Sequence, residues 1–157
     1  MKVRRRARMA VLQALFETDL VEHDAQSALA QRLAEAALPS AGVAFCRRLM
    51  LGVVDHRDAL DLLLQRIAPE RPLAQISPVD RNILRLAAFE ILVDDDTPPK
   101  VVINEAVELA KTFGSDSSSR FVNGVLGTVY TQKHELAAQL AVAAAPSGGE
   151  DRTSGDA

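Results

Sequence analysis

The sequence is poor in cysteine and in large aromatic side chains. Its 157 residues include one cysteine, Cys46, one tyrosine and no tryptophan. A single cysteine cannot form an internal disulfide, and it lacks the paired Cys and His spacing of a zinc site. We therefore expect a protein of the reducing cytoplasm, without cysteine chemistry and without a metal.

Long hydrophobic runs are also missing. Arg, Asp or Glu interrupts each apolar stretch well before the roughly 18 residues that a membrane span needs, and no signal-peptide core follows the basic start. Hydrophobic residues still make up 48% of the chain and charged residues 25%, which is ordinary for a globular domain. We expect one domain over 1–140, no membrane contact, and a disordered small and polar tail over 141–157.

Positive charge is concentrated at the amino end. The first eight residues contain Lys2, Arg4, Arg5, Arg6 and Arg8 and no acid, whereas the other 13 basic residues are mixed with all 21 acidic ones. Guanidinium groups bind phosphate with two hydrogen bonds and stack on bases. Successive residues of a helix point about 100° apart, so a flexible arm that folds onto RNA suits this block. A solvated basic end without function is the alternative.

Apolar residues recur at helical spacing through most of the chain, and seven prolines punctuate them. This pattern predicts helices over 4–20 and 25–37. The segment between Pro39 and Pro69 suits one long helix or two helices with a break at 55–58. Strand-like alternation is missing, so we predict an all-α fold.

The second half carries clearer helix boundaries. Ser77 precedes a proline and then Asp80, which predicts a capped helix start with a carboxylate that returns a hydrogen bond. Gly114 is expected to end the following helix. A last major helix then contains Gly124 and Gly127, which suggest close approach to a neighbouring helix. A further helical turn or two is expected over 134–144.

Residues suited to catalysis are few and scattered. His23, His56 and His134 lie far apart, and the acidic residues over 55–61 point around a helix rather than toward one site. The acidic run 94–96 lacks the spaced ligands of a calcium loop. We therefore predict neither an enzyme nor a bound cofactor.

Three segments form an ordered set in the second half: DRNILRLA at 80–87, PKVVINEAVELAK at 99–111 and FVNGVL at 121–126. With RRRAR at 4–8 and QALF at 13–16, they resemble the NusB family of bacterial transcription antitermination factors. The likeness covers roughly residues 2–132. It implies an all-helical fold of two small antiparallel bundles with about seven helices.

The resemblance also implies a noncatalytic function. NusB proteins pair with NusE, a small-subunit ribosomal protein, and together bind the boxA element of ribosomal RNA transcripts, so that RNA polymerase resists termination. The expected partners are therefore boxA RNA, NusE and the RNA polymerase antitermination complex. The alternative, from another class of function, is a helical protein-interaction module or homodimer with no direct RNA role.

Residue by residue, the resemblance implies two surfaces. Phe16 and Asp80 match family positions at the partner protein, and the RNA positions are Arg4, Arg5, Arg6, Arg8, Ser117 and Phe121. Some family members carry an acid at the position of Ser117, and its loss is expected to favour RNA. Asn104 and Asn123 are family-pattern residues that we interpret as hydrogen-bonding groups between helices.

Overall fold

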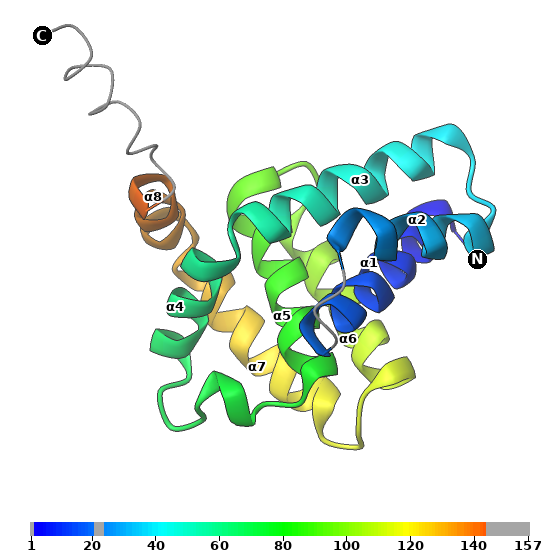
Figure 1. Cartoon of the computed structure of the whole chain (residues 1–157). Helices are drawn as coiled ribbons and strands as arrows, with labels where there is room; N and C mark the ends of the chain where they lie inside the picture. Colours follow the sequence, from blue (N-terminus) through cyan, green and yellow to red (C-terminus); the bar gives the residue numbers. More distant parts are fainter. Residues whose placement is uncertain (1, 21–23, 144–157) are drawn as a thin grey trace, which may run out of the picture.

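The computed structural model describes residues 2–20 and 24–143, and all regular secondary structure within them is helical (Figure 1). The all-α prediction is confirmed. The elements are α1 (Val3–Leu20), α2 (Ala25–Ala36), α3 (Ser40–Asp55), α4 (Arg57–Ile67), the 3₁₀ turn η1 (Leu73–Gln75), α5 (Pro78–Phe89), the π-helical η2 (Glu90–Asp94), α6 (Pro99–Phe113), α7 (Ser118–Thr131) and α8 (Lys133–Ala143). The predicted tail mostly lies outside the described residues, although α8 extends the helical body three residues past residue 140.

The helices form two groups around a shared core. Helices α1, α2 and α3 pack on one another, and α5 contacts α4, α6 and α7 (Figure 1). The predicted break between Pro39 and Pro69 is confirmed, because α3 ends at Asp55 and α4 begins at Arg57. Helix α5 also contacts α1 and α3, so it joins the two groups.

Helix α5 is buried on nearly all sides, as expected of a central helix. Its start is capped as predicted: the backbone N–H of Asp80 donates to Ser77 Oγ at 3.1 Å, and Pro78 occupies the first turn. The predicted hydrogen bond from the helix start back to the Asp80 carboxylate is not seen at Oδ1. Asp80 Oδ1 is buried and has no hydrogen-bond partner among the described residues. The helix passes into η2 and ends at Asp95, whose φ is 51°.

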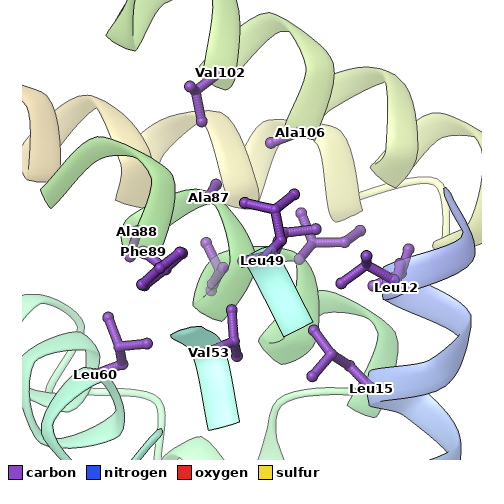
Figure 2. Packing of buried hydrophobic residues seen from close by; sticks show 14 of the residues in the cluster. Leu12, Leu15, Leu49, Val53, Leu60, Ala87, Ala88, Phe89, Val102 and Ala106 are labelled. Carbon is purple, nitrogen blue, oxygen red and sulfur yellow. The ribbon is translucent and has the colours of Figure 1, made fainter. Parts of the chain in front are cut away.

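The core lies where α1, α3, α5 and α6 meet, and Figure 2 shows part of it. Leu12, Leu49 and Ile83 are almost fully buried there. Helix α3 approaches α5 closely at Gly52, because a Cβ at this position would overlap the ring of Phe89. This glycine, rather than the pair in α7, meets a packing requirement.

Several expectations for the second half are wrong in detail. A Cβ on Gly124 or Gly127 would meet no atom within 4 Å, because α7 packs through Val122, Val125 and Val129 and turns its glycines outward. Asn104 and Asn123 are exposed and do not join helices. Gly114 does end α6, and its N–H donates to the carbonyl of Ala110 at 2.9 Å.

Candidate nucleic-acid interface

The arginine block forms the first two turns of α1 rather than a flexible arm. Helix α1 begins at Val3, and the N–H of Arg6 already donates to the carbonyl of Lys2 at 3.1 Å. Each arginine of the block finds an acceptor on another part of the chain, which explains why this end is ordered. The acceptors lie on different elements, as expected for side chains about 100° apart around a helix.

Arg8 points into the interior. Its Nε and Nη2 donate to the two carboxylate oxygens of Glu90, each at 2.8 Å. The side chains of Arg8 and Glu90 are only 4% and 2% exposed, and the Arg8 guanidinium lies 5.1 Å from the ring centre of Phe45. This geometry assigns Arg8 to the core, where it joins α1 to η2, and not to a surface contact.

Arg4 and Arg5 remain half-exposed although both are paired. Arg4 Nη1 lies 3.0 Å from Asp96 Oδ2 and donates to Thr97 Oγ1 at 3.1 Å. Arg5 donates to both carboxylate oxygens of Glu105, at 2.9 and 3.2 Å, and this partner raises the pKa of Arg5. Exposed pairs contribute only about 0–1 kcal/mol. Both guanidinium groups are therefore reachable from solvent although they are paired.

Arg6 turns toward the end of α2. Its Nη2 donates to the carbonyl of Ala36 and, at 3.4 Å, to that of Ala37. Ala37 adopts the left-handed conformation, with φ of 51°. A cation at the carboxyl end of a helix is favourably placed against the helix dipole, so Arg6 helps to end α2.

Arg48 brings a further half-exposed guanidinium, from α3, next to Arg4 of α1, and sequence reasoning missed it. It donates to both oxygens of Asp94, at 2.9 and 3.2 Å, and reaches Asp96 at 3.4 Å. Arg4 and Arg48 lie 4.4 and 5.2 Å from the ring centre of Phe45. The acidic run 94–96 was the available signal, because three adjacent acids attract cations from neighbouring elements.

Ser117 and Phe121 belong to a separate patch at the far end of α6. Ser117 is exposed and precedes α7, and Phe121 is half-buried beneath the guanidinium of Arg71, at 4.5 Å. From Glu105, the partner of Arg5, to Phe113 the α6 axis advances about 12 Å. The structure thus keeps the predicted RNA residues in two patches rather than one.

Phe16 lines a mainly apolar pocket of about 350 Å³ at the junction of α1, α2, α5 and α6. Its walls include Leu12, Val79 and Phe113, with Glu17, Arg32 and Gln13 also lining it. Asp80 directly follows Val79 and is 8% exposed. The two residues predicted at a protein partner therefore lie on elements that meet at this pocket.

In the described part of the chain, no helix combines the length and the apolar character needed to cross a bilayer. Nor do His, Cys, Asp and Glu side chains of these residues gather in threes or more as metal ligands do. Cys46 is buried, and burial raises the pKa of its thiol to about 11.

Comparison with known proteins gives consistent matches over most of the chain. The NusB family model matches residues 5–131. A transcription antitermination protein NusB from Roseiflexus sp. (strain RS-1) is 50% identical over 135 residues, which are 85% of this chain and 95% of that protein. Another, from Dehalococcoides mccartyi (strain CBDB1), is 52% identical over 126 residues, covering 80% and 88%.

Solved structures agree with the fold. A NusB from T. maritima is 36% identical, with a TM-score of 0.78 over 82% of this chain and 91% of that chain. The factor NusB in a crystal structure of NusB and NusE with dsRNA has a TM-score of 0.77 at 23% identity, covering 83% and 98%. At that identity the second match supports the fold alone.

Proposed function

This chain belongs to the NusB family, and from that premise we propose that it is a transcription antitermination factor that binds boxA RNA as a complex with NusE. It acts in the cytoplasm, on ribosomal RNA transcripts within the RNA polymerase antitermination complex, and without catalysis. The observation that carries this proposal is the 50% identity to a NusB over 95% of that protein's length.

The RNA surface consists of the exposed amino-terminal arginines. Arg4 and Arg5 exchange the carboxylates of Asp96 and Glu105 for backbone phosphates, and Arg6 is the third contact. Guanidinium groups bind phosphate with two parallel hydrogen bonds, and the half-exposed side chains of Arg4 and Arg5 are accessible to it. Arg8 contributes indirectly, because it fixes α1 against η2.

The second patch receives a base. The half-buried ring of Phe121 lies under Arg71, and aromatic rings and guanidinium planes are the groups on which unpaired RNA bases stack. Ser117 adds a neutral hydroxyl beside this ring. An RNA strand that runs along α6 reaches both patches at once.

The protein partner occupies the pocket at Phe16. An apolar side chain of NusE fills the space between Phe16, Val79 and Phe113, as anchors of protein interfaces commonly do. Asp80 Oδ1, which lacks a donor in the described residues, gains one as the partner covers the α5 start.

A salt series of boxA binding tests the proposal. The affinity of the chain with NusE for labelled boxA RNA is measured by fluorescence anisotropy at several salt concentrations. Neutralisation of three single-stranded phosphates gives a slope of about −2 in log affinity against log salt. R4Q/R5Q/R6Q is expected to flatten the slope and weaken binding at least about tenfold, which is 1.4 kcal/mol. The matched control R66Q removes an exposed arginine of α4.

One observation favours the alternative function. Arg4, Arg5 and Arg6 already have intramolecular acceptors, as expected of a protein-interaction module or homodimer without an RNA role. Binding that is undetectable with NusE present, or a slope that the triple variant leaves unchanged, would support that alternative. Light scattering of the same samples then shows whether the chain forms a homodimer.

A further inference from the structure

A second group of arginines lines a cavity away from the amino end. The cavity, of about 360 Å³, lies between the end of α1 and the starts of α4, η1 and α5. We call it the arginine pocket, and its lining residues are Asp19, Arg57, Asp61, Leu73, Ala74, Arg81 and Arg85. Three guanidinium groups face two carboxylates here, so the pocket carries an excess of one positive charge.

Asp19 holds the arginines in place from the wall of the pocket. Its Oδ1 accepts from Arg57 Nη2 at 3.1 Å, and its Oδ2 accepts from Arg81 Nε at 2.6 Å. Burial raises the pKa of Asp19. The hydrogen bonds from Arg81 and Asn82 and the charge of Arg85 lower it by more, so the pKa lies below its ordinary value. The carboxylate therefore stays ionised and keeps two guanidinium groups side by side.

Arg85 is fully engaged within the protein. Its Nε and Nη2 donate to Asp61 at 2.7 and 2.9 Å, and its Nη1 donates to Asp19 and to Asn82 Oδ1. Its side chain is 5% exposed. Arg85 therefore balances the two carboxylates and leaves the excess charge to the other two arginines.

Arg57 and Arg81 each have N–H groups that donate to no acceptor among the described residues. Arg57 is 40% exposed and uses only Nη2, toward Asp19. Arg81 uses Nε and, toward the carbonyl of Ile76 at 3.2 Å, Nη1. Because each guanidinium has five N–H donors in a rigid fork, both can bind an oxyanion while they stay on Asp19.

We propose that the arginine pocket binds the phosphoryl group of a small molecule between Arg57 and Arg81. A phosphoryl group offers three oxygens, which suits two guanidinium groups that come from different helices better than a flat carboxylate does. The cavity is in the size range of small-molecule sites, and Leu73 and Ala74 provide an apolar wall for the rest of the ligand.

Titration with inorganic phosphate at constant ionic strength tests this site. The side-chain Nε–H signals of the arginines are followed by NMR in the intact chain, with chloride as the balancing anion. Saturable shifts of the Arg57 and Arg81 signals are expected. R57Q removes one hydrogen bond and one half-exposed side chain, so it keeps the fold and is expected to weaken phosphate binding at least about tenfold, or 1.4 kcal/mol.

Control titrations define the ligand. R66Q leaves phosphate binding unchanged, sulfate binds in place of phosphate, and acetate does not bind. Shifts that never saturate, or that persist in R57Q, would overturn the site. Equal binding of acetate would overturn the phosphoryl assignment, because the pocket would then be a site for an acidic side chain of another protein.

Discussion

The arginine block at the amino end contains two kinds of ion pair within a single turn of helix. Arg5 pairs with Glu105 at the surface, where its side chain is 42% exposed, whereas Arg8 pairs with Glu90 in the core, where both side chains are nearly inaccessible. Both pairs are bidentate and within hydrogen-bond distance, so the contacts alone do not distinguish them. The two pairs differ in their access to solvent. Water or phosphate can replace the carboxylate of a surface pair, whereas neither reaches the buried Glu90.

Breaking the interior pair gives the largest expected effect. Glu90→Gln leaves the Arg8 charge buried without its counter-ion, and removal of one partner of a buried pair costs about 3–5 kcal/mol. Urea unfolding monitored by circular dichroism measures this loss. Arg5→Gln is the matched surface change, and if the two variants unfold at similar urea concentrations, the distinction between the pairs is wrong.

The next effect concerns glycines rather than charges. Gly52→Ala places a methyl group against the Phe89 ring between α3 and α5, and the overpacking is expected to cost about 3 kcal/mol, at the upper end of the usual range. Gly124→Ala, on the open face of α7, is expected to stabilise the protein by up to about 1 kcal/mol. Thermal unfolding of both variants measures the contrast, and equal signs would contradict it.

Asp19 occupies an intermediate position between surface and core. Asp19→Asn weakens bonds to three arginines, with an expected cost of about 2 kcal/mol near neutral pH. The pKa of Asp19 is lowered from 3.8 in the folded chain, so its contribution is complete above that value and is lost as pH falls through the folded pKa. Unfolding curves below pH 4 are therefore expected to depend less on pH in the variant. An unchanged pH profile would show that Asp19 is not the responsible group.

The smallest expected effect on stability comes from the surface arginines. Arg5→Gln removes a solvent-screened pair with Glu105, so the urea midpoint is expected to shift least among these variants. Its effect on boxA binding is expected to be larger than its effect on unfolding. Anisotropy and urea unfolding of the same preparation check this, and a variant that loses stability but keeps its RNA affinity would reverse the assignment.

Local features of the fold could be predicted from the sequence. The Ser77 cap, the break before Arg57 and the end of α6 at Gly114 each depend on residues within a few positions, so propensity and spacing identify them. The apolar stripe of α7 is local in the same sense. It gives the buried face of the helix, whereas the role of the glycines on its other face depends on which neighbours are present.

Pairings over long sequence separation could not be predicted. Arg8 and Glu90 are 82 residues apart, and no local pattern distinguishes the arginine that faces inward from its three neighbours. The π-helical turn that carries Glu90 also left no signal, because its residues suit an ordinary helix. Arg48 was missed because its partners Asp94 and Asp96 lie 46 and 48 residues away, and the acidic run alone does not show which cation reaches it.

The contact of Arg6 with the last carbonyls of α2 links two equilibria: binding of a ligand at the amino end and fraying of the α2 terminus. A nucleic acid that withdraws this guanidinium takes a counter-charge from the α2 terminus, so recruitment at the amino end and fraying of α2 are energetically coupled. The coupling is reciprocal. Any ligand that clamps the turn at Ala37 lowers the availability of Arg6, and any change that loosens the turn releases it.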